Sequence, residues 1–241
     1  MAVATILRFG RPRKEAMPQR KPILNKGRAS APASAPARIP MAISVRHVHL
    51  TQASVEALFG AGHILHAHSP LSQPGQYAAE EVVTLIGPKG RLTDVRVVGP
   101  PRAQDQVELA HTDEIALGVD APLRESGDLA DTPGIVIEGP AGSVTLQRGV
   151  ICALRHIHMS PADADVLGLK NHDEVAVVVM AGKRRLIFGD VIVRVAPSFL
   201  LELHLDSDEG NAAGLRSGSE VVLCAIDPAH VGVDATSGGA G

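Results

Sequence analysis

The stretch VVTLIGPKGRLTDVRVV, residues 82–98, is the part of the sequence that decides the fold. Its two runs rich in β-branched residues, 82–86 and 94–98, flank a Gly-Pro-Lys-Gly turn, which predicts an antiparallel hairpin. The same pattern, a Gly-Pro-x-Gly turn between two strand-like runs, recurs in GIVIEGPAGSVTL, residues 134–146, and predicts a second hairpin. Short strands separated by Gly-rich turns favour a barrel or a sandwich over a parallel, doubly wound sheet.

Apolar runs outside these hairpins extend the series of strands. We expect strands at residues 174–179, 186–188, 191–195, 201–205 and 220–224. Helices are expected at only three places: after Thr51 with a stop at Gly60, from Ser160 onward, and from Asp206 to Gly214. We therefore predict a mainly β fold with short helices (α+β), arranged as two β-barrel-like lobes.

The composition is that of a folded protein without a membrane-spanning helix. Of the 241 residues, 45% are hydrophobic but only 2% are aromatic, so Val, Leu, Ile and Ala must form the core. No apolar run approaches the roughly 20 residues that a transmembrane helix needs. The only cysteines are Cys152 and Cys224, which excludes a disulfide framework and a four-cysteine zinc module and predicts a reducing, cytoplasmic setting.

Charge is distributed unevenly along the chain. Residues 1–40 carry nine Lys and Arg but one acidic residue, in a composition typical of disordered segments. We expect a disordered basic leader over residues 1–40, a folded body over 41–226 and a flexible tail over 227–241. The leader could be a solvated tail, an organellar transit peptide or a short docking peptide. The acidic balance of the body argues against nucleic acid as the main ligand.

Two His-x-His pairs stand in nearly identical contexts, RHVHLT at residues 46–51 and RHIHMS at residues 155–160. In an extended strand, side chains at i and i+2 share a face, so each pair presents two imidazoles together. Such pairs commonly hold a transition metal, above all zinc. The alternative is that they pack against strands and bond to backbone carbonyls; the repetition favours metal. In residues 201–205, Glu202 and His204 share a face, which makes His204 a candidate third ligand.

The other histidines and the two cysteines give weaker signals. His66 and His68 alternate within a Pro-, Ser- and Gly-rich stretch, which favours loop residues. The histidines with no partner nearby in the sequence are expected at the surface; they are His63, His111, His172 and His230. The two cysteines, Cys152 and Cys224, are expected in the core.

Five blocks follow one another in order. They are RHVH at 46–49, PLSQPGQYAAEE at 70–81, PLRESGD at 122–128, RHIHMSP at 155–161 and DSDEGNAAG at 206–214. Together they closely resemble the PduL-type phosphate propanoyltransferases, the phosphotransacylases associated with bacterial microcompartments. The resemblance covers residues 41–226, essentially the whole expected body. Five ordered blocks make it far more specific than a single motif would.

The resemblance implies two intertwined β-barrel lobes with the active site between them. It implies two zinc ions per chain and reversible transfer of a short acyl group, propanoyl or similar, between acyl-CoA and inorganic phosphate. Arg102 would hold the phosphate. The metal ligands would be His47, His49 and Glu108 on one side and His156, His158 and His204 on the other, with their exact partition between the two ions left open. Without the resemblance, Arg102 and Glu108 would be read as a solvated loop residue and a solvent-facing strand residue.

Two loops would shape the pockets for CoA, acyl group and phosphate. The candidate substrate-binding residues on them are Gln73, Gly75, Gln76, Arg124 and Ser126. The alternative is that turn chemistry alone explains the Pro and Gly of these loops. The sequence shows no Ser-His-Asp and no convincing Cys-His arrangement, so we expect phosphate to attack acyl-CoA directly, without an acyl-enzyme.

The resemblance also implies partners and a setting. The ligands would be acyl-CoA, CoA and phosphate, and the chain would act as a homo-oligomer in the bacterial cytoplasm, in propanediol degradation. The leader is a candidate encapsulation peptide that would bring the enzyme to shell or cargo proteins inside a microcompartment, although Pro12 and Pro18 would interrupt a helix there. Neither a nucleic acid nor a membrane partner is expected.

Two functions of other classes remain open. One is a zinc-dependent hydrolase of thioesters or amides, in which water replaces phosphate. The other is a non-catalytic, shell-associated metal-binding module, which would bind zinc without turnover. Phosphate dependence of CoA release would separate the transferase from the hydrolase.

Overall fold

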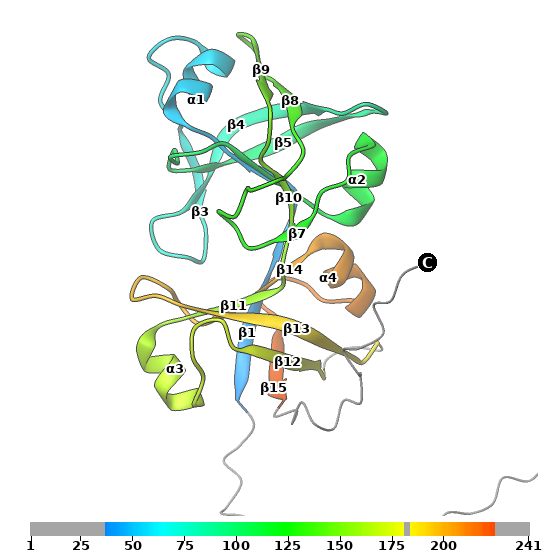
Figure 1. The fold of residues 1–241 in the computed structure, drawn as a ribbon. Helices are drawn as coiled ribbons and strands as arrows, with labels where there is room; N and C mark the ends of the chain where they lie inside the picture. Colours follow the sequence, from blue (N-terminus) through cyan, green and yellow to red (C-terminus); the bar gives the residue numbers. More distant parts are fainter. Residues whose placement is uncertain (1–36, 181–183, 225–241) are drawn as a thin grey trace, which may run out of the picture. The chain divides into compact units, whose positions relative to one another are not determined.

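The structure, a computed structural model, describes residues 37–180 and 184–224 (Figure 1). The expected leader lies outside the described residues as far as residue 36, and so does the expected tail over 227–241. The described residues form fifteen strands and four short helices, so the prediction of a mainly β fold is confirmed. None of the described helices has the length and apolar character needed to span a membrane.

One lobe is a closed barrel of six strands in the order β1-β14-β11-β13-β12-β15. Its strands are β1 (Arg38–Ser44), β11 (His156–Met159), β12 (Glu174–Val179), β13 (Leu186–Val195), β14 (Glu202–Asp206) and β15 (Glu220–Cys224). Strand β1 pairs in parallel with β14 and antiparallel with β15, so it closes a barrel that otherwise comes from the second half of the chain. Figure 1 shows this blue strand among yellow and orange ones. Ile39, Met41, Ile157 and Leu203 fill the barrel and are fully buried.

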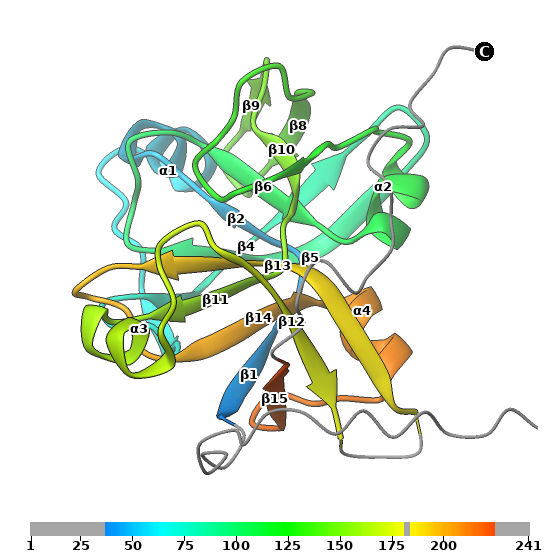
Figure 2. The same cartoon turned by 60° about the horizontal axis from the view of Figure 1, so that its bottom comes forward.

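The other lobe is a curled, nine-stranded sheet along the path β7-β10-β6-β2-β5-β4-β8-β9, with β3 paired to β4. Its strands are β2 (His47–His49), β3 (Ala67–Pro70), β4 (Tyr77–Ile86), β5 (Arg91–Gly99), β6 (Gln106–Leu109), β7 (Leu123–Arg124), β8 (Ile135–Glu138), β9 (Ser143–Leu146) and β10 (Val150–Ala153). The two hairpins expected from the Gly-Pro-x-Gly turns are β4–β5 and β8–β9, and both are confirmed. Figure 2 shows β2 beside β6 in this lobe.

The chain crosses between the lobes twice. It leaves the barrel after Ser44 and enters the curled sheet at His47, and it leaves the sheet after Ala153 and re-enters the barrel at His156. Each crossing therefore leads directly into one of the two His-x-His pairs. The prediction of two barrel-like lobes is confirmed, one of them closed and the other open.

Three of the four helices begin where the sequence predicts them. Thr51, Ser160 and Asp206 are the N-caps of α1 (Gln52–Phe59), α3 (Pro161–Leu167) and α4 (Ser207–Ala213). The expectation of only three helices is wrong, because α2 (His111–Leu117) is a fourth. Its N-cap is Ala110, whose side chain cannot accept a hydrogen bond, so the usual start signal is missing. Instead, the backbone N–H of Ala110 donates to Asp113 at 3.2 Å.

The expectation of separate strands at 186–188 and 191–195 is also wrong, because both belong to β13. Gly189-Asp190 resembles a turn in the sequence, and Asp190 has a left-handed φ of 51°. Val177 faces Phe188 and Val175 faces Val191, so three steps along β13 oppose two along β12. The extra residue is accommodated as a β-bulge, which bends the strand without ending it.

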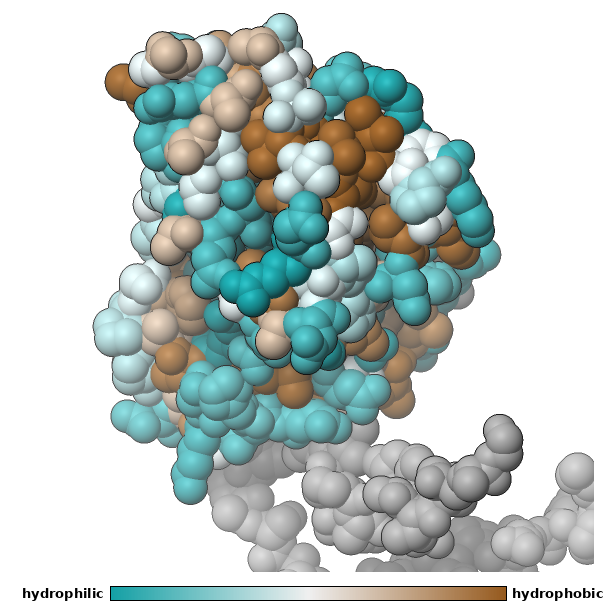
Figure 3. Space-filling model, turned by 45° about the horizontal axis from the view of Figure 1, so that its top comes forward, coloured by the Kyte–Doolittle hydropathy of each residue, from teal (hydrophilic) through white to brown (hydrophobic). Residues whose placement is uncertain are grey.

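The surface view in Figure 3 shows hydrophilic and apolar areas interspersed, with apolar atoms gathered in the upper part of this face. Apolar residues that are largely exposed are few and lie at scattered positions of the chain, among them Ile64, Ile115, Val166 and Ile187. Single exposed apolar side chains of this kind are ordinary on soluble domains.

Candidate active site

The first candidate metal cluster is formed by His47, His49 and Glu108. Both histidines lie on β2, on the same face, and Glu108 lies opposite His47 on the neighbouring strand β6. The Nε2 atoms of the two histidines are 3.1 Å apart. Glu108 places its carboxylate oxygens 3.6 Å from His47 Nε2 and 3.7 Å from His49 Nε2. The three ligand atoms lie within 4.8 Å of one another, an arrangement that could hold a metal ion.

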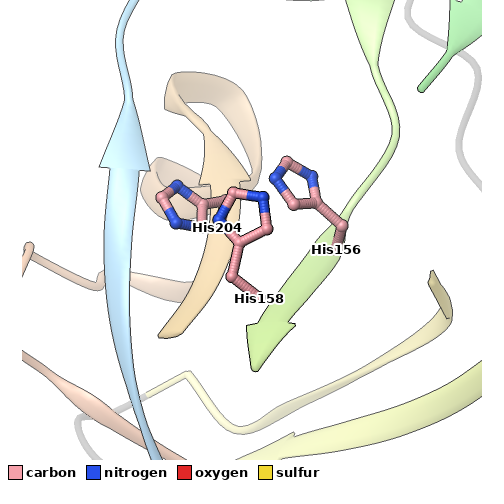
Figure 4. A group of neighbouring side chains, drawn as sticks. All are labelled: His156, His158 and His204. Atoms are coloured by element: carbon pink, nitrogen blue, oxygen red, sulfur yellow. The ribbon is translucent and has the colours of Figure 1, made fainter. Parts of the chain in front are cut away.

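The second cluster is formed by His156, His158 and His204. His156 and His158 come from β11, and His204 lies opposite His156 on β14. The ring centroids are 4.6 to 5.0 Å apart, and Figure 4 shows the three imidazoles gathered between the two strands. Their ligand atoms also lie within 4.8 Å of one another.

The two clusters have the same construction. In each, the first histidine of the pair faces the third ligand across an antiparallel strand pair, His47 facing Glu108 and His156 facing His204. In each, the third ligand stands two residues before a helix N-cap, which is Ala110 for α2 and Asp206 for α4. This second parallel, between residues 108–113 and 204–209, is a signal that sequence reasoning missed.

The arginine before each His-x-His pair is held in the same way. Arg46 forms an ion pair at 2.7 Å with Asp113, the third residue of α2. Arg155 forms an ion pair with Glu209, the third residue of α4. Each acid also accepts the backbone N–H of its helix N-cap. A helix start therefore anchors the chain immediately before each pair of histidines.

Hydrogen bonds to the backbone set which imidazole nitrogens are free. His47 Nδ1 lies 2.9 Å from the carbonyl of Val45, and His156 Nδ1 lies 2.7 Å from the carbonyl of Leu154. A carbonyl only accepts, so Nδ1 must carry the proton, which leaves the Nε2 lone pair free. The sequence left open whether these histidines bind a metal or bond to backbone carbonyls. In the structure one imidazole can do both, because Nδ1 bonds to the carbonyl while Nε2 is available to a metal.

Burial keeps His49, His156 and His158 uncharged at neutral pH. Desolvation, assisted by the neighbouring histidines, lowers the pKa of His49 to about 4, of His156 to about 4 and of His158 to about 2. Burial would raise the pKa of Glu108, but His47 and His49 outweigh it and hold that pKa well below its ordinary value. Neutral imidazoles beside a carboxylate are the protonation states that a metal requires.

Unpartnered buried nitrogens give an independent test of whether a metal fits. Both ring nitrogens of His158 are buried, and none of the described residues gives them a hydrogen bond. Such atoms are costly unless they are satisfied by another group. The His158 ring is also stacked on Phe199, with centroids 4.0 Å apart, which fixes its plane. The three-histidine cluster therefore has the donor atoms and the unmet bonding capacity expected of a metal site.

Both clusters line one cavity of about 550 Å³ whose walls come from both lobes. All six candidate ligands, and also Arg102, Gln73, Gln76 and Ser126, contribute to its lining. Gly75 and Arg124 do not line this cavity. Gly75 lies in the same loop as Gln73, with a φ of 77°, and Arg124 lines a second cavity of about 490 Å³ together with Ser126.

Arg102 is connected to the first cluster through Ser126 and Gln106. Its Nη1 donates to the Ser126 hydroxyl at 3.2 Å, and Gln106 Nε2 donates to that hydroxyl at 2.9 Å and to Glu108 at 2.6 Å. Gln106 also accepts the backbone N–H of Gly127 at 2.8 Å. Gln106 is buried and orients the Glu108 carboxylate. Sequence reasoning missed it, because only the strand register shows that it stands next to the site.

The loop before β4 is fastened to the barrel lobe. Gln73 donates to the carbonyl of Leu200 at 3.2 Å and accepts the Leu200 backbone N–H at 3.2 Å. Ser72 donates to Glu202, which lies 3.1 Å from His204 Nε2. Both Gln73 and Gln76 line the cavity, but the side-chain amide of Gln73 is already hydrogen-bonded to the backbone of Leu200.

Arg194 is a further basic residue of the cavity that sequence reasoning missed. It lies on β13 with its guanidinium carbon 5.8 Å from the centroid of the Phe199 ring. Its Nε is 3.6 Å from Glu125 of the opposite lobe. Four arginines line the cavity, Arg46, Arg96, Arg102 and Arg194, and their guanidinium groups suit an anionic ligand.

Three of the histidines that were expected at the surface, because the sequence shows no partner for them, lie beside carboxylates in the structure. His63 lies 2.8 Å from the buried Glu81, His111 lies 3.3 Å from Glu114, and His172 lies 3.1 Å from Glu125. His230 lies outside the described residues. Among the cysteines, Cys152 is buried as expected, and Cys224 is intermediate in exposure.

Comparison with known proteins identifies the family. Residues 40–216 match the family model described as phosphate propanoyltransferase. The phosphate propanoyltransferase of Thermotoga maritima is 54% identical over 181 residues, 75% of this chain and 86% of the relative. That of Shewanella putrefaciens is 49% identical over 76% of this chain and 86% of the relative. That of Salmonella typhimurium is 51% identical over 73% of this chain and 83% of the relative.

The family-model match extends through both lobes and includes both clusters and Arg102. A family match over most of the chain and relatives at about half identity agree with each other. The chain therefore belongs to the phosphate propanoyltransferase family, enzymes that transfer an acyl group to phosphate.

Proposed function

We propose that this enzyme transfers propanoyl, or a similarly short acyl group, reversibly between CoA and inorganic phosphate, with two zinc ions bound at the two clusters. The observation that supports the proposal best is that both three-ligand clusters and Arg102 line one cavity. Family membership supplies acyl transfer to phosphate; CoA as the acyl carrier and zinc as the metal are the parts we propose.

The residues would share the metals by cluster. His47, His49 and Glu108 would hold one ion, and the three histidines of the barrel lobe would hold the other. Zinc bound by these residues would supply a Lewis acid that can stabilise a thiolate and polarise a carbonyl oxygen. The orienting contacts are provided by the chain: Gln106 holds Glu108, and the Val45 and Leu154 carbonyls fix the tautomers of His47 and His156.

Arg102 would bind and orient the phosphate. Its guanidinium is permanently charged and can form two parallel hydrogen bonds to an oxyanion. The Ser126 hydroxyl supports one of its nitrogens from behind. A phosphate oxygen then bonds to the thioester carbonyl carbon, the carbon–sulfur bond breaks, and the electron pair leaves with sulfur. The products are an acyl phosphate and CoA, and the reverse reaction uses the same groups.

The buried Cys152 is not an activated nucleophile for an acyl-enzyme. Cys152 is buried, and desolvation together with Asp206 raises the pKa of its thiol to about 12. A thiol with so high a pKa is a poor nucleophile at neutral pH. We expect no labelled protein after a pulse of radiolabelled acyl-CoA; a stable protein adduct would contradict direct attack.

The decisive assay follows both products. CoA release is measured with a thiol reagent, and acyl phosphate is trapped as a hydroxamate, in the presence and absence of phosphate. We expect CoA release to require phosphate and to be matched by equal acyl hydroxamate. Release without phosphate, giving free acid, would instead support the hydrolase. Family membership already makes the chain an enzyme, which argues against the non-catalytic module.

We also propose that the enzyme acts as a homo-oligomer in the bacterial cytoplasm, with the leader directing it into a microcompartment through shell or cargo proteins. The support is the basic charge of residues 1–40 and the resemblance of the body to microcompartment enzymes. Residues 1–25 fused to a fluorescent protein should give discrete foci in a compartment-forming host. Diffuse fluorescence would contradict encapsulation.

A further inference from the structure

A third cluster of potential metal ligands lies in the curled-sheet lobe. It consists of His63, His66 and Glu81, none of which lines the cavity described above. The two histidines lie between α1 and β3, and Glu81 lies on β4. Their ligand atoms are within 4.8 Å of one another, as in the other two clusters. We propose that this cluster is an additional divalent-cation site, with a donor set suited to zinc.

The position of Glu81 is the first argument. Side chains of β4 alternate between core and surface, and Glu81 stands in the same row as Ala79, Val83 and Leu85, which fill the core. Only 8% of Glu81 is exposed. A carboxylate in such a row is costly unless a cation or several hydrogen bonds compensate it.

The partners of Glu81 are the second argument. Among the described residues, no Lys or Arg lies within ion-pair distance of Glu81, and its side-chain contacts are the two imidazoles. The two imidazoles and the backbone N–H of His66 satisfy its hydrogen bonds, and no described Lys or Arg compensates its charge. A bound cation would compensate the charge.

The geometry is the third argument. His63 Nε2 and His66 Nδ1 both lie 2.8 Å from the same oxygen, Oε1 of Glu81. The other oxygen accepts the backbone N–H of His66 at 3.1 Å, which holds the carboxylate in place. The His63 ring stacks on Phe59 with centroids 5.2 Å apart, which holds the ring. Two imidazoles and one carboxylate, converging and supported from behind, form one of the ligand sets of zinc.

The cluster is open to solvent on one side. The His66 side chain is 64% exposed, whereas that of Glu81 is 6% exposed. An ion can therefore enter from solvent, and water can complete its coordination. Strand β3 follows directly and leads into the loop that Gln73 fastens to the barrel lobe. A bound cation would brace the base of that loop.

The test compares zinc content after equilibrium dialysis of the full chain against buffer with added zinc. We expect the double variant His63→Gln/His66→Gln to bind one zinc fewer per chain than the unmodified protein. The matched controls are His68→Gln and Glu80→Gln, which remove the exposed neighbours of the cluster and should leave the zinc content unchanged. Equal zinc in the double variant and the unmodified chain would overturn the proposal.

Two further measurements keep the test decisive. If the double variant fails to fold, Glu81→Gln, which preserves the size of the side chain, gives the same comparison. In the unmodified chain, nitrogen-15 NMR should show His63 Nε2 and His66 Nδ1 shifting on zinc addition, and the absence of a shift would contradict the site. The difference of one zinc does not depend on acyl transfer, so failure of the proposed function would leave it unchanged.

Discussion

At the scale of single residues, the site depends on side chains whose protonation is set by the surrounding protein. Backbone carbonyls hold the protons of His47 and His156 on Nδ1, and burial keeps His49 and His158 neutral. The sequence predicted these histidines from their spacing, since i and i+2 of a strand share a face. It could not show Gln106 or Arg194, because their places at the site follow from strand register and not from any local motif.

The first prediction concerns Arg102. Arg102→Gln should lower kcat/KM for phosphate by about 10- to 100-fold, because a charge-assisted hydrogen bond is worth about 1.5–3 kcal/mol. Steady-state kinetics with varied phosphate measures this, and Arg91→Gln, at an exposed ion pair on β5, is the control. An unchanged KM and kcat for phosphate would contradict the role of Arg102.

The second prediction concerns Gln106. Gln106→Ala removes the amide that donates to Glu108 at 2.6 Å. Metal affinity of the chain should fall by about 10- to 100-fold, as is usual when a group that orients a ligand is lost. Competition with a coloured chelator measures the affinity, and the exposed Gln147→Ala is the control. Wild-type affinity in Gln106→Ala would show that Glu108 needs no such support.

The third prediction is a pH dependence of stability in the metal-free chain. The pKa values of His49 and His156 fall from 6.5 to about 4 on folding, so the unfolded chain binds more protons below about pH 6.5. Stability should therefore fall as the pH drops from about 6.5 towards 4 and should not change for this reason above pH 7. Urea unfolding at a series of pH values measures it. A flat profile between pH 6.5 and 4 would contradict the burial of neutral imidazoles.

At the scale of elements, the same local unit occurs in both lobes: an arginine, a His-x-His strand, and a facing strand that runs into a capped helix. The sequence showed the His-x-His half of this repeat, because RHVH and RHIH are nearly identical. The sequence did not reveal the other half of the repeat, the facing strand and its helix, because α2 has alanine at its N-cap where α4 has aspartate. The strand β13 was divided in the prediction for a related reason, since Gly-Asp reads as a turn although it forms a bulge.

The fourth prediction tests this unit through Arg46. Asp113 is buried, with 4% of its side chain exposed, whereas Arg46 is 37% exposed. Arg46→Met should lower the free energy of unfolding by about 1–3 kcal/mol, because it leaves the Asp113 carboxylate without its main partner. The control is Arg38→Met at the exposed pair with Glu220, where a loss below about 1 kcal/mol is expected. Equal losses in both variants would contradict the anchoring role.

At the scale of the whole molecule, the described chain begins in the barrel with β1, forms the curled sheet with β2–β10 and returns to the barrel, and both lobes line one cavity. Barrel or sandwich architecture was predictable from short strands and Gly-rich turns. Which strand closes which lobe was not, because the pairing of β1 with β14 and β15 joins residues more than 150 positions apart. The grouping of the six candidate ligands into two sets of three, which the family resemblance implied, corresponds to two clusters set by strand register.

The fifth prediction follows from the position of β1. A chain that begins at residue 37 should fold and keep full acyltransferase activity, because every described element is retained. A chain that begins at residue 45 lacks β1, including the fully buried Ile39 and Met41, and should not fold cooperatively. Circular dichroism melts and the acyl phosphate assay measure both. Cooperative folding of the shorter chain would contradict barrel closure by β1.

The most direct test of the central claim measures metal content and acyl transfer on the same sample. The protein is stripped with a chelator, assayed for acyl phosphate formation from propanoyl-CoA and phosphate, and assayed again after zinc is returned. We predict that turnover disappears with the metal and comes back with zinc in proportion to ions bound. Full turnover in protein shown to be free of metal would contradict the account.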